Sequence, residues 1–174
     1  HPNLMCTAFF KELAEQHATV ALGKAIGVEF EDDSLASNAE AVRAWFEDPD
    51  EQSNIEKITY MRLSNQDLLV MPAELKLLPN LQVLNLSDNL LKQVDLSGLP
   101  NLKWLSVSKN SLIYLDGSQL PQLTHLFAQG NHLTNIKLPE ELPDLKKLQL
   151  KNNQLPKEVK ERITASFPKT CTRW

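Results

Sequence analysis

Histidine and cysteine side chains, which could perform catalysis or bind a metal, are few in this sequence, and their spacing supports neither role. The four histidines are His1, His17, His125 and His132. They show no metal-ligand spacing with cysteine, aspartate or glutamate. Neither cysteine lies in a sequence typical of a nucleophile, and Gly23-Lys24 lacks the upstream glycine of a phosphate-binding loop. The sequence therefore predicts a protein that is not an enzyme and that uses no metal or cofactor.

Aromatic and basic side chains instead indicate a binding surface. Several of them occupy matching places in a pattern that recurs along the second half of the chain. Large side chains grouped on a surface are typical anchors of protein interfaces. The residues that we expect to bind a partner are Tyr60, Arg62, Trp104, His125, Phe127, Lys147, Gln149 and Lys151. Whether they meet depends on the elements that carry them.

Those elements are copies of one pattern, Leu-x-x-Leu-x-Leu-x-x-Asn-x-Leu, within residues 58–155. The copies begin at Ile58, Leu81, Leu102, Leu123 and Leu145, so the periods are 23, 21, 21 and 22 residues. Self-similarity at this period is typical of coils that stack on one another, because no single coil can bury its leucines alone. The Leu-x-Leu spacing of two is the period of a strand, so one strand per coil should build a parallel sheet.

The asparagine of each copy stands where the chain leaves the strand. Its amide both donates and accepts, so stacked asparagines should form a ladder that satisfies buried backbone groups. Gln66 replaces the asparagine of the first copy, so the ladder should start imperfectly. Ala128 replaces a core leucine in the fourth copy, which suggests a tighter coil or a neighbour that fills the space.

The third, fifth and seventh residues of each copy should point away from the leucines, onto the exposed face of the sheet. Most of them are small or polar, as a solvated sheet requires, but Trp104, His125 and Phe127 are not. Adjacent strands lie about 5 Å apart, so we expect these three side chains to form one patch. The alternatives are that they pack on one another or that a long side chain of a cap covers them.

The five copies resemble the leucine-rich repeat family, over about 100 of the 174 residues. The resemblance implies an α/β fold with a curved parallel sheet of about five coils. A second resemblance covers Ala44-Trp45-Phe46-Glu47-Asp48-Pro49 and the stretch 58–65. It is similar to the junction between helical cap and repeats in leucine-rich repeat proteins of intracellular Gram-negative bacteria. Many of these are secreted effectors that enter host cells, and some carry a ubiquitin-ligase domain.

Helical caps should cover both ends of the repeats, since an open end exposes leucines and unpaired strand edge. We divide the chain into an N-terminal cap (1–54), the repeats (55–155) and a C-terminal cap (156–174). The N-terminal cap should begin with a helix over residues 4–24. Its apolar face would comprise Met5, Phe9, Leu13 and Val20.

A second helix should start near Ser37 through a capping box and stop at Asp48-Pro49. We expect its Trp45 and Phe46 to belong to the core of the cap. After the repeats, Pro156 can occupy the first turn of a C-terminal helix. The apolar face of that helix would comprise Val159, Ile163 and Phe167.

Charge and cysteine content indicate in which compartment the protein acts and which classes of partner it can bind. The net charge of −4 argues against a general nucleic-acid binder. Residues 1–54 hold three basic and eleven acidic groups, a net of −8, which leaves +4 for the rest. No apolar run approaches the ~18 residues of a membrane span, and no signal peptide is visible. Cys6 and Cys171 should be free thiols in a reducing compartment, unless the two ends of the chain meet.

The sequence thus favours a non-catalytic protein-binding module, monomeric, without nucleic-acid or membrane partners. Its concave sheet would dock the partner through Trp104, His125 and Phe127, with Lys147, Lys151 and Arg62 as a charged rim. The second resemblance implies a host protein as partner and the cytoplasm, of the bacterium or of a host cell, as location. Two alternatives stay open: a substrate-recognition domain of a larger enzyme such as a ubiquitin ligase, and an intracellular regulatory adaptor.

Overall fold

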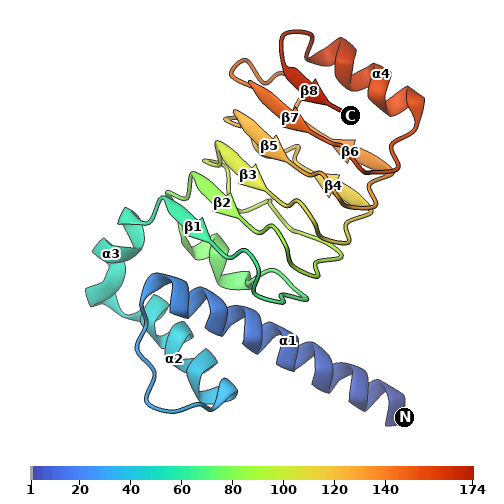
Figure 1. Ribbon diagram of the computed structural model, residues 1–174. Helices are drawn as coiled ribbons and strands as arrows, with labels where there is room; N and C mark the ends of the chain where they lie inside the picture. The colour runs from blue at the N-terminus through green and yellow to red at the C-terminus, as the bar shows by residue number, and fades with distance from the viewer. Residues whose placement is uncertain (1) are drawn as a thin grey trace.

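Six short strands form one parallel sheet that runs along the molecule (Figure 1). The computed structural model describes residues 2–174, with side chains from residue 7 onward, so expectations for His1, Met5 and Cys6 lie outside the described side chains. In their order across the sheet the strands are β1 (Tyr60–Arg62), β2 (Val83–Asn85), β3 (Trp104–Ser106), β5 (His125–Phe127), β7 (Lys147–Gln149) and β8 (Cys171–Arg173). Equivalent residues of successive repeats pair with each other. The predicted strand is present in every copy.

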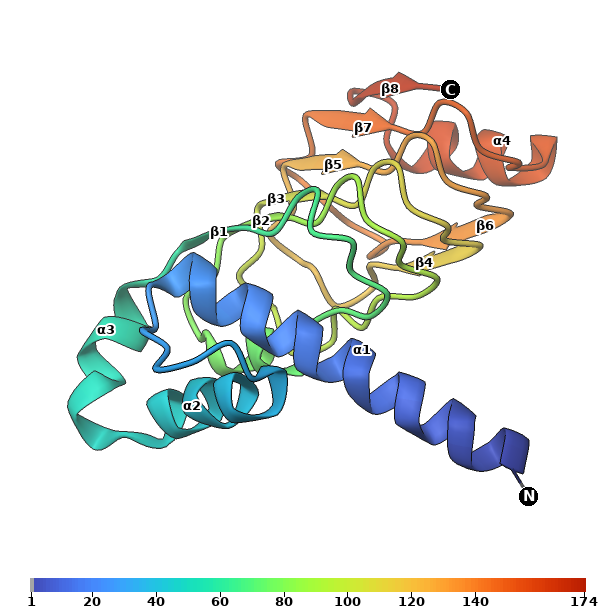
Figure 2. The same ribbon diagram turned by 60° about the horizontal axis from the view of Figure 1, so that its bottom comes forward.

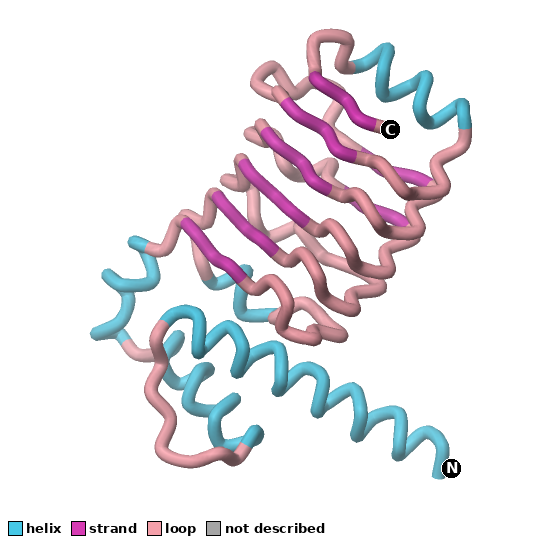
Figure 3. Tube along the Cα trace, in the orientation of Figure 1, coloured by secondary structure: helices cyan, strands magenta, loops and turns pink. Residues whose placement is uncertain are grey.

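The return segments form a second, two-stranded parallel sheet that the repeat pattern did not predict. It consists of β4 (Tyr114–Asp116) and β6 (Asn135–Lys137), and it lies across the coils from the main sheet (Figure 2). Each strand has one buried residue, Leu115 or Ile136, between two exposed ones. The other connections are loops (Figure 3), apart from the short 3-10 helix η2 (Ala73–Leu77) in the first coil.

Leucines fill one core that continues from the N-terminal helices to the C-terminal helix. The middle residue of each repeat strand is at most 2% exposed, and these residues are Met61, Leu84, Leu105, Leu126 and Leu148. Burying such a side chain contributes about 1.5–3 kcal/mol, and each coil relies on its neighbours to cover it. Ala128 is also fully buried, so the smaller residue does not open the core to water.

The predicted asparagine ladder is present. It consists of Asn89, Asn110, Asn131 and Asn153, each of which accepts a backbone N–H bond from the preceding coil. Asn110 Oδ1 accepts from the Leu91 N–H at 3.0 Å, and its Nδ2 donates to the carbonyl of Leu86 at 3.0 Å. The Gln66 side chain is exposed and its backbone N–H donates to Asn89 Oδ1 instead. The ladder therefore begins at Asn89, as the substitution predicted.

The residue before each ladder position has a left-handed backbone. The value of φ lies between 53° and 71° at Asn65, Asp88, Lys109, Gly130 and Asn152. Glycine, asparagine and aspartate tolerate this conformation better than other residues, which explains their use in four of the five copies. Lys109 is the exception, and its Nζ lies 3.9 Å from Asp88 Oδ1 of the preceding coil.

Helices cover the open end of the first coil, as expected. They are α1 (Pro2–Ile26), α2 (Leu35–Glu47), the 3-10 turn η1 (Pro49–Glu51) and α3 (Gln52–Lys57). The pair α1 and α2 pack closely because Gly23 has no side chain: a Cβ there would lie 2.2 Å from Val42 Cγ2. Gly27, with φ of +86°, ends α1. Trp45 and Phe46 pack against the core, as predicted.

Two details of the predicted cap are wrong. The N-cap of α2 is Ser34 rather than Ser37, and Ser34 Oγ accepts from the Ser37 N–H at 3.4 Å. The helix can start earlier because Ser34 has the extended backbone that a cap requires. Phe9, placed on the apolar face of the first helix, is 58% exposed. The first turns of α1 project beyond α2 and the first coil (Figure 1), and the buried residues described in this helix begin only at Ala18.

The C-terminal cap contains the predicted helix and one further strand. In α4 (Lys157–Ser166) and at its C-cap, Val159, Ile163 and Phe167 are buried, as expected. Pro156 is the N-cap with an extended backbone, rather than a residue of the first turn as predicted. The chain then returns to the main sheet as β8, which pairs with β7. Among the residues that the structure describes, no helix combines the length and apolar character needed to cross a bilayer.

Candidate binding surface

The outward side chains of the main sheet form a surface that we call the sheet face. It comprises the third, fifth and seventh residues of each repeat together with Cys171 and Arg173 of β8. Two of these residues, Ser106 and Ser108, are buried rather than exposed as predicted. Strand register sets their positions: Trp104 pairs with His125, and His125 with Lys147. Side chains alternate between the two faces of a strand. Because the leucines of these strands are buried in the core, the residues of the sheet face point to the opposite side.

The predicted aromatic patch is assembled on β3 and β5. The ring centroids of Trp104 and Phe127 are 5.1 Å apart at an interplanar angle of 43°. Those of His125 and Phe127 are 6.4 Å apart and stacked at 14°. Separations of this size are favourable for aromatic pairs. The three residues therefore pack on one another, as the alternative expected, yet each is only partly buried.

The hydrogen bond of the His125 ring to Thr124 determines whether the other ring nitrogen, Nε2, is a donor or an acceptor. Its Nδ1 lies 2.9 Å from Thr124 Oγ1, and that hydroxyl donates to the carbonyl of Lys103 at 2.8 Å. A hydroxyl has one proton, so we assign the proton of the neutral ring to Nδ1, which donates to Thr124. Nε2 is then an acceptor for a group outside the sheet.

Basic side chains adjoin the aromatic patch on one side. Lys147 Nζ lies 5.6 Å from the centroid of the Phe127 ring, a separation at which a cation is attracted to the ring face. Lys151 is exposed in the turn after β7, and Gln149 is partly buried between them. The structure thus places these three predicted residues at one end of the sheet face.

The two predicted residues of β1 lie at the other end. Tyr60 is 57% exposed, and Arg62 Nε donates to Ser64 Oγ at 3.0 Å. Val83 and Asn85 of β2 separate them from the aromatic patch. Tyr60 and Arg62 therefore belong to the same face without touching the central cluster.

Sequence reasoning missed two features of the sheet face. Arg173 pairs in register with Gln149, and finding it required recognition of β8, whose sequence contains no leucine. Gln129 is partly buried, and its Oε1 is shielded from solvent and accepts no hydrogen bond. Its seventh position in the fourth repeat was the available signal, but burial of the amide oxygen depends on neighbours that a pattern does not specify.

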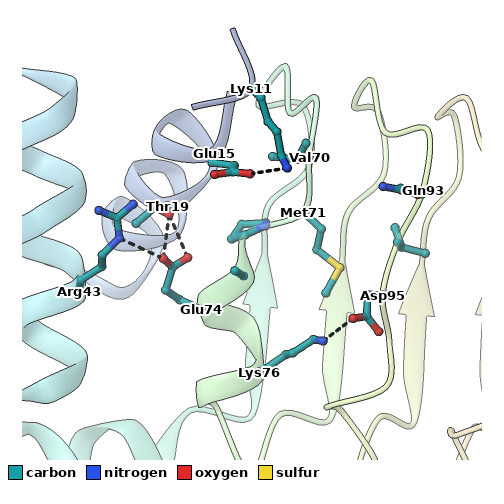
Figure 4. A pocket seen from close by; sticks show the side chains of 13 residues that line it. Lys11, Glu15, Thr19, Arg43, Val70, Met71, Glu74, Lys76, Gln93 and Asp95 are labelled. Atoms are coloured by element: carbon teal, nitrogen blue, oxygen red, sulfur yellow. Dashed lines mark hydrogen bonds and ion pairs between the residues drawn. The ribbon is translucent and has the colours of Figure 1, made fainter. Parts of the chain in front are cut away.

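Several charged side chains outside the sheet face form pairs that connect elements of the fold. A groove of about 700 Å³ lies between the N-terminal helices and the first two return segments. Its charged groups are paired, for example Arg43 with Glu74 and Lys76 with Asp95 (Figure 4). Hydrogen bonds from Lys76 and then Ser97 hold the pKa of Asp95 well below its usual range. Among the described residues, no group of three or more potential ligands could hold a metal ion.

Comparisons with known proteins agree with the repeat architecture. Residues 56–112 match the leucine rich repeat model. A leucine-rich repeat protein of Leptospira interrogans is 33% identical over 73% of this chain, with a TM-score of 0.63. The functional domain of InlJ from Listeria monocytogenes, which includes a cysteine ladder, is 25% identical over 59% of this chain, with a TM-score of 0.54. The matched regions span 34% and 22% of those two chains. No curated protein matches the sequence.

The structure and the comparisons support the same family. Five copies of the motif place one strand each in a parallel sheet, and the solved structures similar to it are bacterial leucine-rich repeat proteins. This fold is typical of protein–protein interaction modules. The chain is a leucine-rich repeat protein.

Proposed function

We propose that this chain is a non-catalytic module that binds a partner protein on its sheet face. The observation that carries the proposal is the cluster of Trp104, His125 and Phe127, partly exposed on adjacent strands. The equivalent positions of the second repeat hold valine and asparagine. Nothing in the repeat motif requires aromatic rings there, and leaving them in water is unfavourable. Interface energy is commonly concentrated in a few such residues.

Within this proposal, Trp104 and Phe127 are the anchors and His125 supplies a hydrogen-bond acceptor through Nε2. Lys147, Lys151 and Gln149 flank the anchors on one side. Tyr60 and Arg62 would contact the far end of the partner. A partner that covers all these residues spans the sheet from β1 to β7, which is four strand spacings, or about 19 Å.

A host protein is the partner class that we propose for a secreted bacterial effector, and the cytoplasm is the proposed compartment. The bacterial leucine-rich repeat proteins of similar structure support this choice. Cys171 is exposed and free, as suits a reducing compartment. A recognition domain of a larger protein is the second candidate, because the matched region spans only 34% of the Leptospira protein. A catalytic domain in the same reading frame would favour the second candidate.

The test is a comparison of three baits: the wild-type chain, Trp104→Ala and Ile113→Ala. Ile113 is 60% exposed but lies outside the sheet face, so its variant controls for loss of exposed apolar surface. We expect a host-cell protein that the wild type and Ile113→Ala retain and Trp104→Ala loses. Equal retention by all three baits would contradict the proposal and would direct attention to Lys157, Lys160 and Arg162, three exposed basic residues of α4.

A further inference from the structure

We infer that the partner segment on the sheet face is acidic: an apolar side chain seats against Trp104 and Phe127, and carboxylates a few residues away contact Lys147, Lys151 and Arg173. This inference rests on the proposed function and adds the chemistry of the partner. It follows from how charge is distributed over the face, from where the cations stand relative to the rings, and from the lack of carboxylate partners for those cations among the described residues.

The sheet face contains no acidic residue. Of its seventeen positions, four are basic, namely Arg62, Lys147, Lys151 and Arg173. The chain as a whole has more acidic than basic residues, with a net charge of −4, so the absence of acids on this face is not a result of composition. Asp88, in the turn after β2, pairs with Lys109 outside the face. A surface of one charge sign selects partners of the opposite sign.

Within the part of the chain that the structure describes, the four cations of the face have no carboxylate partner. None of the ion pairs among the described residues includes Arg62, Lys147, Lys151 or Arg173. The polar contact of Arg62 is with the neutral Ser64, and the contact of Lys147 is with the Phe127 ring. Their charges are therefore available to an external carboxylate, whereas Lys76 and Arg43 elsewhere already have acidic partners.

The positions of the strands set the spacing within the partner. From β3, which carries Trp104, to β8, which carries Arg173, there are three strand spacings, or about 14 Å. An extended peptide that crosses the strands advances about 3.3 Å per residue, so about four residues separate the apolar anchor from the carboxylate at Arg173. Arg62 lies two spacings away on the other side, or about three residues.

Two other possible occupants of the sheet face, a nucleic acid and a second copy of this chain, are less suitable than an acidic peptide. A nucleic acid also offers anions and stacking bases, but only four of the seventeen positions of the face are basic, whereas a nucleic acid carries a phosphate at every nucleotide. A second copy of this chain could present its acidic cap, where residues 1–54 carry a net charge of −8. Exposed Phe9 and Phe10 do stand near Glu12 and Glu15 on α1, but these residues are held in a helix rather than an extended segment, and Glu15 already pairs with Lys11. Both occupants are outcomes of the test below.

The test is to pan a random twelve-residue peptide library on the wild-type chain and to measure the enriched peptides by fluorescence anisotropy. We expect peptides with an aromatic or large aliphatic residue and two or more acids about three to five positions away. The triple variant K147E/K151E/R173E should bind them at least about tenfold more weakly. The matched triple variant K24E/K57E/K92E, which changes the net charge equally at exposed sites outside the face, should bind within about threefold of the wild type.

The variants separate this inference from the proposed function. Enriched neutral peptides that need Trp104 but tolerate K147E/K151E/R173E would overturn the inference and leave the proposed function standing. Peptides that all tolerate Trp104→Ala would overturn both. Should the triple variant not fold by circular dichroism, Lys151→Glu alone serves, because Lys151 is exposed in a turn; it should weaken binding by at least about threefold.

Two further measurements decide between occupants. Sedimentation should show that the wild-type chain is a monomer. Self-association of the wild type that is lost in the triple variant would assign the face to a second copy. A single-stranded DNA oligonucleotide should bind more weakly than the acidic peptides. Tighter binding of the oligonucleotide would overturn the inference in favour of a nucleic acid.

Discussion

At the residue scale, one asparagine in each of the last four repeats satisfies backbone groups of two successive coils. Asn110 accepts from Leu91 of the coil before it, and it donates to Leu86 and to Val107 of its own coil. All three bonds are buried, where water cannot replace them. The asparagine is thus a structural link between coils rather than a polar surface residue.

Asn110→Ala should lower the free energy of unfolding, because it leaves these backbone groups unpaired. The expected loss is about 1–3 kcal/mol for each group left unsatisfied, measured by urea denaturation. Gln154→Ala is the control, since its side chain is exposed, and its effect should stay within about 0.5 kcal/mol. A similarly small effect of Asn110→Ala would mean that the ladder contributes nothing to stability.

The same scale shows which site residues the sequence could predict. Trp104, His125 and Phe127 were predictable as a group because a repeat period converts sequence spacing into neighbouring strands. The burial of Gln129 Oε1 was not, since it depends on side-chain packing across coils. The choice of Ser34 over Ser37 as N-cap was also not predictable from residue type, because both are serines and only the backbone geometry separates them.

At the scale of elements, the joint between α1 and the first coil depends on one buried carboxylate. Thr19 Oγ1 donates to both oxygens of Glu74, at 3.0 Å and 2.9 Å, and Arg43 Nε lies 3.7 Å from the same group (Figure 4). Glu74 belongs to η2, so the contact connects both cap helices to the first return segment.

Glu74→Ala should loosen α1 from the repeats. The loss of unfolding free energy should be about 1–3 kcal/mol, the penalty of leaving the buried Thr19 hydroxyl unpaired. Hydrogen exchange should rise in α1 more than in the main sheet, because the sheet keeps all its backbone bonds. Glu31→Ala, an exposed loop residue, is the control. Unchanged exchange in α1 would show that the apolar core alone holds the cap.

A second inter-coil link, between Lys76 and Asp95, should be visible in a pH titration. The pKa of Asp95 is lowered from 3.8 by hydrogen bonds from Lys76 and Ser97. The pair's contribution to stability is therefore present above about pH 3.8 and is lost as pH falls toward the lowered pKa. By carboxyl NMR, Asp95 should stay ionised below pH 3.8, and Lys76→Ala should move its pKa back up.

Asp116 is an internal control for this titration, because Ser118 lowers its pKa. That pKa should not respond to Lys76→Ala. If the pKa of Asp95 were equally unresponsive, the Lys76 bond would not exist in solution, and Ser97 alone would account for the shift.

The sequence predicted the strands that lie within the repeat motif and missed those that lie outside it. The five strands of the motif were predictable because each contributes apolar residues at a spacing of two. The strands β4, β6 and β8 have three residues each, like the others, but their residues lie outside the recurring motif. For β8 the sequence Cys-Thr-Arg has no large apolar residue, and the strand is held by backbone bonds such as Cys171 N–H to the Lys146 carbonyl.

At the scale of the whole molecule, stacking of coils separates the two ends of the chain. The start of α1 lies beyond the first coil and β8 lies beyond the last (Figure 1). One core nevertheless continues from Ala18 to Phe167, so caps and repeats should unfold together. The division of the chain at residues 54 and 155 stays a prediction, and a single transition in calorimetry would argue that the three parts are not independent.

Separation of the ends predicts two free thiols. Cys171 is free and exposed. Alkylation of the purified chain without reductant should therefore add two labels, on Cys6 and Cys171, by mass spectrometry. An unlabelled species that is two hydrogens lighter would mean that the two cysteines are bridged, which the separated ends do not allow.

The measurement that tests the central claim most directly is a pair of values for Trp104→Ala: partner affinity and thermal unfolding. Truncation of an interface anchor weakens binding by about 2 kcal/mol or more, which is at least about thirtyfold. The free energy of unfolding should fall by only about 1 kcal/mol, the contribution of one aromatic pair. Truncation of a fully buried tryptophan would lower it by about 3–5 kcal/mol. We predict a large loss of affinity with a small loss of stability; unchanged affinity, or a loss of stability of the buried kind, would contradict the assignment of the sheet face as the binding surface.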